Sequence, residues 1–358
     1  MDPLAGLLDG PRARGAFLLR MVMDPPWSVR IEDRAPLCVM TVARGEAWVV
    51  PDRGEASPVS RRGATLSKGR ARGGPEERGA EHGRPSTGAE APRRRTGPEK
   101  AVRLGPGDVA VVRGPDPYTV AGDPATEPQA WILPGEVCRT AEGADLAERM
   151  ALGVRTWGNS EHGAATMLVG TYRMDGEISR RLLDALPPLL VLGRERYDSP
   201  LLPWLGEEIV REEAGQTAVL DRLLDLLLIS VLRAWFARPE ARAPAWYRAL
   251  GDPVVGRALR LLQNNPGHPW TVALLAAETG ISRAVLARRF TELVGEPPMA
   301  YLTGWRLDLA ADLLREPDAT LGAVARRVGY GSPFALSAAF KRVRGVSPRE
   351  HRSAASAG

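Results

Sequence analysis

Two stretches of the sequence, fifty residues apart, have serine, leucine and phenylalanine in matching places, and the first of them also carries three arginines. The first reads GISRAVLARRF (residues 280–290) and the second reads GYGSPFALSAAF (residues 329–340). Similarity at a fixed spacing indicates one structural unit used twice. Because arginine can donate two parallel hydrogen bonds to guanine, the chemistry to consider is recognition of DNA. The matched positions are Ser282 and Ser332, Leu286 and Leu336, Phe290 and Phe340, Gly295 and Gly345, and Pro298 and Pro348.

Each copy has the capping and turn residues of a helix-turn-helix. Thr271 is placed to cap a short helix, Gly280 supplies the turn, and Ser282 caps a second helix that runs through Leu293. The second copy repeats this order with residues Thr320, Gly329 and Ser332. In such a motif the second helix enters the major groove of DNA.

Helical periodicity sorts the side chains of these two second helices. We expect buried stripes at every third or fourth residue, and the opposite faces to meet DNA. Arg288 is the candidate for reading guanine, while Arg283 and Arg289 lie on the flanks, where phosphate contacts are expected. The expected stripes are Leu286, Phe290 and Leu293, and Leu336, Phe340 and Val343. The expected DNA-facing set is Arg283, Ala284, Ala287, Arg288, Arg289, Thr291, Ser332, Phe334, Ser337, Ala338, Lys341 and Arg342.

Phe334 and Arg344 of the second copy are further candidates for contact with DNA. Phe334 either contacts a thymine methyl group or packs against the preceding helix, and the pattern leaves both open. Arg344 joins Lys341 and Arg342 as a candidate for phosphate contact.

Residues 297–316 between the copies predict one amphipathic helix, with Leu302, Trp305, Leu309 and Leu313 facing inward. About seventeen residues at 1.5 Å each make a rod of about 25 Å. A rigid spacer of this kind would let two recognition helices enter successive major grooves, about 34 Å apart. Upstream, Asp252 is expected to cap the first helix of this domain, with Pro253 in its first turn.

The first half of the chain has the pattern of a β-sandwich or barrel. Short β-rich runs separated by turns are predicted at residues 36–45, 46–51, 101–114, 118–122, 129–135 and 165–174. Residues 52–100 interrupt these runs with 12 basic and 7 acidic residues and almost no large apolar ones. Such a segment buries too little surface to offset its ordering entropy, so we expect a disordered insertion.

Apolar residues at helical spacing then predict helices at residues 178–192, 199–213 and 215–238, and residues 243–253 read as a linker. The wide stripe of Leu220, Leu223, Leu224, Leu227, Leu228, Val231 and Leu232 fits either packing on the protein's own β-domain or a dimer interface. The stripe does not identify its partner.

Composition excludes several other classes. Two cysteines, Cys38 and Cys138, are too few for a disulfide framework or a four-thiolate zinc site. Cys38 is expected in the core and Cys138 at the surface. The N-terminus lacks a signal-peptide pattern and the most apolar stretch is broken by charges, so a cytoplasmic protein without membrane contact is expected. Basic charge is concentrated in two segments of the chain, which has a net charge of +5. Residues 52–100 contain 12 basic and 7 acidic residues, and residues 252–354 contain 14 basic and 9 acidic ones. This distribution indicates an anionic partner.

These motifs resemble the AraC/XylS family of bacterial transcription regulators. The resemblance lies in WTVALLAAETGISRAVLARRFTELVGEPPMAYLTGWRLDLAADLL and LGAVARRVGYGSPFALSAAFKRVRGVSPREHR. It implies binding to double-stranded promoter DNA, usually activation through RNA polymerase, and an N-terminal sensing or dimerisation domain. Family members commonly have arginine where Ala338 stands and a larger side chain where Ala284 stands. We therefore expect few direct contacts between these helices and the bases.

The N-terminal region is similar to the cupin-like domain of a subset of these regulators, through PLCVMTVARGEAWVV, VRLGPGDVAVVRG and LLDALPPLLVL. Metal-dependent cupins need clustered histidines, and only His82, His162, His268 and His351 occur, while Tyr118 stands where a metal cupin would offer histidine. We therefore expect no metal, no cofactor and no catalysis. Trp48, Tyr118 and Trp131 either line a pocket for a small apolar effector or belong to the core.

The predicted fold class is multidomain α+β, with a cupin-like β-barrel or sandwich followed by an all-α domain of two helix-turn-helix motifs joined by a linker helix. The predicted boundaries are residues 1–195 for the sensor or dimerisation domain, 196–251 for a helical dimerisation or linker region, and 252–354 for the DNA-binding domain. The alternative is a ligand-binding or catalytic cupin whose C-terminal helices bind a protein; a homodimer is compatible with either.

Overall fold

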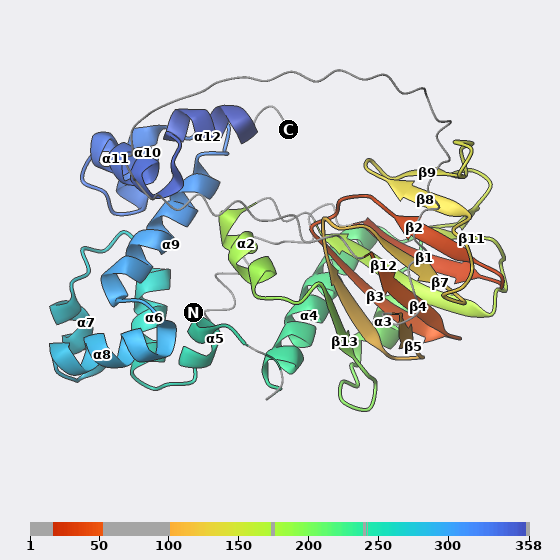
Figure 1. Cartoon of the computed structure of the whole chain (residues 1–358), viewed down its shortest axis with the longest axis horizontal. Coiled ribbons are helices and arrows are strands. Elements are labelled where there is room, and N and C mark those ends of the chain that lie inside the picture. The colour runs from red at the N-terminus through yellow and green to blue at the C-terminus, as the bar shows by residue number, and fades with distance from the viewer. Residues whose placement is uncertain (1–16, 53–100, 173–175, 239–240, 242, 356–358) are drawn as a thin grey trace, which may run out of the picture.

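The computed structural model places two β-sheets in the first half of the chain and helices in the second (Figure 1). It describes residues 17–52, 101–172, 176–238, 241 and 243–355. The expected disordered insertion, residues 52–100, lies outside the described residues except for its first position.

A seven-stranded sheet forms the centre of the first half, in the order β10-β11-β1-β12-β3-β6-β13. Its middle strands pair antiparallel, with Val39 opposite Gly170 on β12 and opposite Val111 on β6. The strands are β1 (Phe17–Met23), β3 (Leu37–Arg44), β6 (Val109–Arg113), β10 (Ala151–Gly153), β11 (Thr156–Gly158), β12 (Ala165–Tyr172) and β13 (Leu189–Leu192).

A six-stranded sheet packs over one face of the first, in the order β5-β4-β7-β2-β8-β9. The two sheets enclose an apolar core that includes Met21, Trp27, Met40 and Trp157. The strands are β2 (Ser28–Ile31), β4 (Ala47–Pro51), β5 (Val102–Leu104), β7 (Tyr118–Ala121), β8 (Ala130–Leu133) and β9 (Val137–Arg139).

The central strands are apolar on both sides because both faces of the larger sheet are covered. Side chains alternate between the faces of a strand. On β3, Cys38 and Met40 face the second sheet, whereas Leu37 and Val39 face a layer of helices. This explains why residues 37–42 show no polar alternation even though the strand pairs antiparallel.

That layer consists of α3 (Leu201–Glu208) and α4 (Gln216–Phe236), with α2 (Glu177–Asp184) at its edge. The α4 stripe from Leu220 to Leu232 is buried against the sheet residues Leu37, Val39 and Val111. Of the two interpretations of this stripe, packing on the protein's own β-domain is therefore the one that the structure shows. Tyr172 reinforces it by donating a 2.7 Å hydrogen bond to the carbonyl oxygen of Leu224.

The second half is all helical. Its elements are α5 (Ala245–Ala249), α6 (Val255–Asn264), α7 (Val272–Thr279), α8 (Arg283–Val294), α9 (Pro298–Leu313), α10 (Leu321–Arg327), α11 (Pro333–Arg344) and α12 (Pro348–Ala355). A short helix, α5, therefore occupies the segment predicted as a linker. In the described part of the chain, no helix is both long and apolar enough to cross a bilayer.

The predicted fold class is confirmed, and all six predicted β-rich runs contain strands. The single helix predicted at residues 178–192 is wrong, because helix α2 ends at Asp184 and residues 189–192 form strand β13. Pro187 and Pro188 separate the two, since proline lacks the N–H donor that a continuing helix needs. Strands β1, β2, β9, β10 and β11 were not predicted; three of these five have only three residues.

The packing of α4 gives a paired prediction. Leu224→Ala should lower the free energy of unfolding by about 2–5 kcal/mol, because Leu224 is 1 % exposed and its removal leaves a cavity. Leu226→Ala, on the same helix but 49 % exposed, should change it by about 0.5 kcal/mol or less. Urea unfolding of both variants measures the difference; equal losses would contradict the orientation of α4 described here.

Candidate nucleic-acid interface

The first helix-turn-helix is formed by α7 and α8, and side-chain caps start both helices. The Thr271 hydroxyl accepts a 3.1 Å hydrogen bond from the Leu274 amide, and the Ser282 hydroxyl accepts one of 3.4 Å from the Val285 amide. Gly280 has a φ of +73°, a left-handed conformation that glycine adopts without strain. The sequence prediction of this motif is confirmed.

The second motif, α10 and α11, repeats this geometry. Thr320 accepts from the Ala323 amide at 3.2 Å and Ser332 accepts from the Ala335 amide at 3.1 Å. Gly329, with a φ of +83°, makes the turn. Ser332 is thus engaged as a helix cap, which leaves its hydroxyl less available to a ligand than predicted.

The buried stripes are shorter than predicted. Leu286, Phe290, Leu336 and Phe340 are fully buried, but the last member of each predicted stripe is not: Leu293 is 36 % exposed and Val343 is 56 % exposed. Both lie in the last turn of their helix, where less of the domain remains to cover them. Ala339 is instead among the buried residues of α11.

The outward faces of α8 and α11 carry most of the predicted DNA-facing residues. Arg288 is 73 % exposed, and its nearest acidic neighbour is Glu292, one turn along the helix at 3.8 Å. Phe334 is 83 % exposed, which excludes the alternative that it packs against the preceding helix. Ala287 and Ser337 are half-buried at the edges of the two faces, and the exposed remainder are Arg283, Ala284, Thr291, Ala338, Lys341 and Arg342.

Two of the arginines considered for phosphate contact have partners inside the protein. Arg289 forms an ion pair with Asp252, with Nε–Oδ2 at 3.0 Å and Nη2–Oδ2 at 2.5 Å. Arg344 is only 17 % exposed and bonds to Glu177 and Asp308. In this conformation Arg344 therefore lies off the outward face of α11.

Asp252 also explains the start of the domain. Its carboxylate accepts hydrogen bonds from the amides of Val254 and Val255, at 3.0 and 2.9 Å. The α-helix begins at Val255, two residues later than an N-cap at Asp252 with Pro253 in the first turn implies, but the capping role of the side chain is present.

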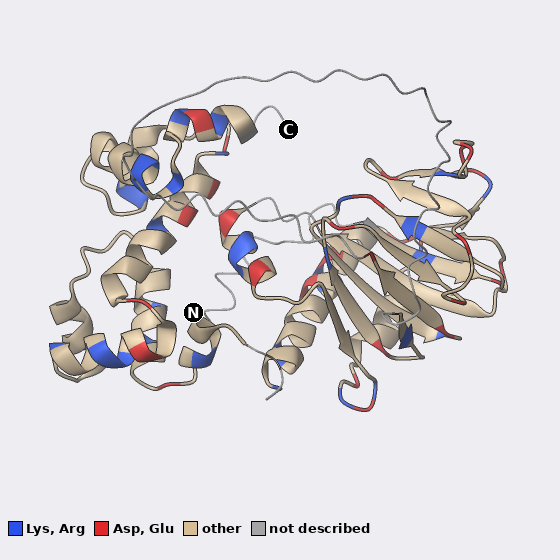
Figure 2. Ribbon diagram, in the orientation of Figure 1, with Lys and Arg blue, Asp and Glu red and all other residues tan. Residues whose placement is uncertain are grey.

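Helix α9 joins the two motifs by contributing to the core of each. Tyr301 and Leu302 pack with Leu286 and Phe290 of the first motif. Leu307 and Ala310, on the next turns, pack with residues of the second motif that include Leu336. Leu302 and Trp305 are buried as predicted, while Leu309 and Leu313 are only half-buried. Recognition helices α8 and α11 lie near opposite ends of α9 (Figure 1), and Figure 2 shows Lys and Arg on both.

The third side of α9 is covered by α2, which follows the sheet strand β12. Trp305 and Ile178 are buried together at this contact. The N-terminus of α2 has glycine, Gly176, at its cap position, and Asp312 of α9 supplies the missing acceptor. Its carboxylate accepts from the amides of Glu177 at 2.6 Å and Ile178 at 3.2 Å.

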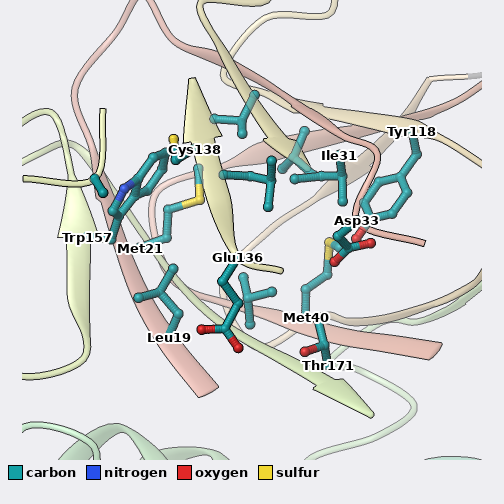
Figure 3. Close-up of a pocket in the computed structure, with 15 residues that line it drawn as sticks. Leu19, Met21, Ile31, Asp33, Met40, Tyr118, Glu136, Cys138, Trp157 and Thr171 are labelled. Carbon is teal, nitrogen blue, oxygen red and sulfur yellow. The ribbon is translucent and has the colours of Figure 1, made fainter. Parts of the chain in front are cut away.

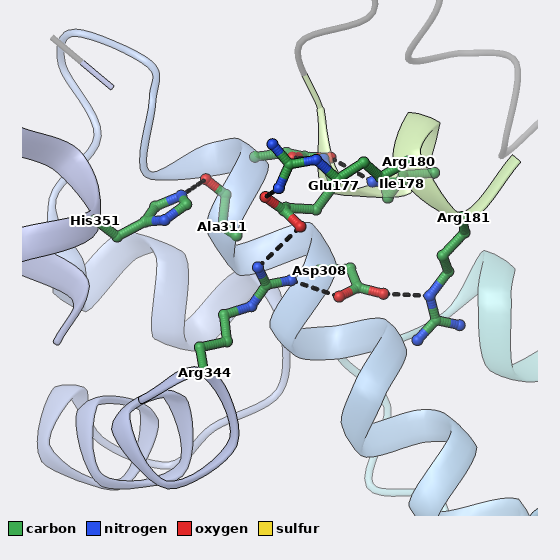
Figure 4. A network of polar contacts seen from close by, with 9 residues as sticks. Glu177, Ile178, Arg180, Arg181, Asp308, Ala311, Arg344 and His351 are labelled. Atoms are coloured by element: carbon green, nitrogen blue, oxygen red, sulfur yellow. Dashed lines mark hydrogen bonds and ion pairs between the residues drawn. The ribbon is translucent and has the colours of Figure 1, made fainter. Parts of the chain in front are cut away.

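An ion network surrounds this contact (Figure 4). Asp308 pairs with Arg181 of α2 and with Arg344 of α11, the latter at 2.5 Å, and Glu177 pairs with Arg344 at 3.0 Å. Burial raises the pKa of Asp308 although both arginines oppose the shift. Burial has the same tendency at Glu177, but the hydrogen bond and charge of Arg344, aided by Arg180, outweigh it and lower the pKa of Glu177. No local pattern in the sequence indicates this network, because its members are far apart in the chain.

A cavity of about 190 Å³ opens between the two sheets (Figure 3). Tyr118, one of the three predicted ligand-binding aromatics, lines it; Trp48 and Trp131 are not among its lining residues. On strand β4 the neighbours Ala47 and Val49 are buried while Trp48 is only partly so, which puts its side chain on the outer face of the sheet. Trp157 of β11 lines the cavity instead.

Neither cysteine has the properties of a reactive thiol. Cys38 is buried as expected, and burial raises its pKa to about 12. Cys138 is also buried, contrary to the expectation that it lies at the surface, and burial raises its pKa to about 11. The described residues contain no group of three or more His, Cys, Asp or Glu that could hold a metal ion.

Comparison with known proteins places this arrangement in a family. A profile described as "Cupin" matches residues 2–69 and 90–237, and one described as "Helix-turn-helix domain" matches residues 275–354. A "Putative AraC-like transcription regulator" of Streptomyces antibioticus is 35% identical over 232 residues, which cover 63% of this chain and 76% of that protein. The "RCS-specific HTH-type transcriptional activator RclR" of Escherichia coli K12 is 28% identical over 192 residues, covering 52% of this chain and 67% of that protein.

Among solved structures, the DNA-binding domain of AdpA in complex with a target DNA is 35% identical, covers 29% of this chain and 93% of that one, and has a TM-score of 0.27. The profiles and the relatives define a DNA-binding transcription regulator with a helix-turn-helix domain. The chain belongs to the AraC family, in the branch with an N-terminal cupin domain.

The ion pair between Asp252 and Arg289 gives a prediction about pH. Burial tends to raise the pKa of Asp252, but its hydrogen bonds with Val255 and Val254 and its contact with Arg289 lower it overall. A carboxylate with a lowered pKa adds stability above its unfolded pKa of about 3.9 and loses this contribution as pH falls through the folded pKa. Asp252→Asn should therefore be less stable than wild type at pH 7, and this difference in the free energy of unfolding should narrow as the pH falls below about 4.

Urea unfolding at pH 7, 5, 4 and 3 measures this gap. Asp318→Asn, which changes an exposed carboxylate of the same domain, serves as the matched control and should show no comparable gap. A difference between Asp252→Asn and wild type that stays constant over this range would contradict the role of the charge.

Proposed function

We propose that the protein activates transcription by placing α8 and α11 in two successive major grooves of one promoter site, under the control of a small molecule bound in the cupin domain. The observation that carries the proposal is the repeated, capped helix-turn-helix whose two recognition helices are held by one rigid rod. Helix α9 has 16 residues, a length of about 24 Å, and its side chains enter both cores. Helices α8 and α11 pack near opposite ends of α9 and extend the assembly beyond each end. A connecting helix of about 24 Å is therefore compatible with major grooves about 34 Å apart.

The exposed residues fall into two proposed groups, those that read bases and those that contact the phosphate backbone. Arg288 is the candidate for a bidentate contact to guanine, and Phe334 for an apolar contact to a thymine methyl group. Arg283, Lys341 and Arg342 are the candidates for phosphate contacts. The Ser337 hydroxyl is a candidate for contact with a base edge or a phosphate. The Thr291 hydroxyl donates a 2.8 Å hydrogen bond to the Ala287 carbonyl oxygen, so toward DNA it is a candidate acceptor. Arg289 lies on the flank of α8 and is paired with Asp252, so its proposed role is to hold α8 in position rather than to read a base.

Activation and its partners rest on the relatives. The name of the Escherichia coli relative calls that protein a transcriptional activator, and an activator bound at a promoter acts by contact with RNA polymerase. A homodimer is proposed through the surface of α3 and α4 that faces away from the sheet, where Trp204, Val219 and Leu226 are exposed. Control by a small molecule is supported by the apolar cavity of the cupin domain and by the contact of α2 with α9.

Arg288→Ala tests the reading role. The variant should bind its specific site about 1–3 kcal/mol more weakly and should tolerate more bases at one position, because a bidentate contact discriminates by that amount. The measurement is a gel shift on DNA upstream of the gene, at several salt concentrations, against random DNA. A specific complex with a steep salt slope is the expected wild-type behaviour.

Arg283→Ala is the matched control, since it removes an exposed arginine one turn earlier on the flank of the same helix. It should weaken specific and random DNA alike and reduce the salt slope by about one. If Arg288→Ala also weakens both DNAs equally, its assignment to a base is wrong. If wild type shows no preference for any upstream DNA, the proposed function itself fails.

A further inference from the structure

The cavity of the cupin domain has an unusual combination of linings. Most of its wall is apolar and comes from both sheets, including Met21 and Trp157. Two of its lining residues, Asp33 and Glu136, are acidic, and its lining contains no lysine, arginine or histidine. A half-buried carboxylate beside apolar side chains, with no cation near it, is less well solvated than one at the surface.

Asp33 shows the effect of that environment. It is half-buried next to Tyr118 and Met40 in Figure 3. Its carboxylate accepts a 2.9 Å hydrogen bond from the Ala35 amide, and within the described residues no basic side chain forms an ion pair with it. Burial raises the pKa of Asp33 despite the backbone hydrogen bonds. A cation beside it would reverse this penalty.

The two ends of the cavity differ in character. In Figure 3, Trp157 and Met21 lie on the side opposite Asp33, and Glu136 lies below them, between the two sides of the view. The volume is somewhat larger than the cavity of about 150 Å³ that accommodates benzene in another protein. A ligand with one aromatic or short alkyl group and one polar head would fill such a site.

We propose that the effector of this regulator is a small amphipathic amine, whose ammonium group pairs with Asp33 and whose apolar part packs against Trp157 and Met21. This inference rests on the proposed control by a small molecule and names its ligand class. The charge of the site selects a cation over a neutral or anionic molecule of the same size, because attraction between opposite charges is strong where water is partly excluded. Glu136, which is exposed, adds to the negative potential at the opening.

Calorimetric titration of the full chain with three molecules of similar size tests the proposal. Phenethylamine should bind at least tenfold more tightly than 2-phenylethanol, and phenylacetate should bind more weakly than both. Asp33→Asn keeps an acceptor for the Ala35 amide but removes the charge. It should lower the affinity for phenethylamine about tenfold and leave that for 2-phenylethanol unchanged, which also shows that the cavity is intact.

Asp116→Asn, an exposed carboxylate outside the cavity lining, is the matched control and should leave all three affinities unchanged. The proposal is overturned if the amine binds no better than the alcohol, if Asp33→Asn weakens both equally, or if no probe binds. Gel shifts without any ligand distinguish this failure from failure of the proposed function, since DNA binding is measured separately.

The ion network at α2 carries a second, independent inference. Lys341 and Arg342 of α11 are exposed, but Arg344, in the same last turn, is held by Glu177 and Asp308 (Figure 4). Glu177 belongs to α2, which follows directly on the cupin strands. A carboxylate that follows the cupin strands thus forms an ion pair with a basic side chain of the second recognition helix.

We infer that docking of α2 on α9 is an autoinhibitory contact that withholds Arg344 from the DNA backbone. Movement of α2 away from α9 breaks the pair with Glu177 and removes the cap that Asp312 supplies. Arg344 then keeps only Asp308 as its partner, and a DNA phosphate competes for its guanidinium group against one carboxylate instead of two. An added phosphate contact increases both DNA affinity and its dependence on salt.

Glu177→Gln tests this contact because it removes the charge on α2 and leaves Asp308 in place. It should raise affinity for specific DNA about three- to tenfold and steepen the salt slope by about one. Arg181→Gln, which weakens the same docking without contacting Arg344, should also raise affinity. The double variant Glu177→Gln with Arg344→Gln should lose the gain in salt slope.

Glu195→Gln is the matched control, because it neutralises an exposed carboxylate of the cupin domain and should leave DNA affinity unchanged. Unchanged or lowered affinity in both Glu177→Gln and Arg181→Gln overturns the inference, as does a gain that persists in full in the double variant.

Discussion

The burial of helix α9 on three sides is the constraint on which the C-terminal half depends. Tyr301 and Leu302 complete one helix-turn-helix core, Leu307 and Ala310 complete the other, and Trp305 is covered by the cupin domain. A helix with apolar residues around most of its circumference is not a simple amphipathic spacer. Since neither motif has a complete core without α9, the distance between the recognition helices is set by the same contacts that fold them.

The contact between α2 and α9 joins the cupin domain to the helix-turn-helix domain largely through charged side chains. Its apolar part is small, with Ile178 and Trp305 at the centre, and carboxylates and arginines surround it. Removing one partner of a partly buried ion pair leaves an uncompensated charge, so separating α2 from α9 costs free energy.

How much of this was predictable differs between the two halves. In the DNA-binding half, caps, turn glycines and buried phenylalanines recur in order, and these local signals identify each motif. The differences lie at helix ends, such as Leu293, Val343 and the start of α6 at Val255, and in the half-buried Leu309 and Leu313 of α9. In the cupin half, strands of three residues carry too little pattern to detect, and prolines at 187 and 188 mark a change from helix to strand that apolar periodicity conceals. The partners of Arg289 and Arg344 depend on residues distant in the sequence, as does the replacement of Trp48 and Trp131 by Trp157 in the cavity wall.

Two of the positions proposed to face the major groove have very small side chains, and this bears on the DNA that the protein would select. Ala284 and Ala338 are exposed but have only a methyl group to offer a base pair. Where no side chain reaches a base, the energy of a complex depends on how easily that stretch of duplex narrows or bends. Under the proposed function, its binding sites should therefore share flexibility and groove width at those steps more than a fixed base sequence.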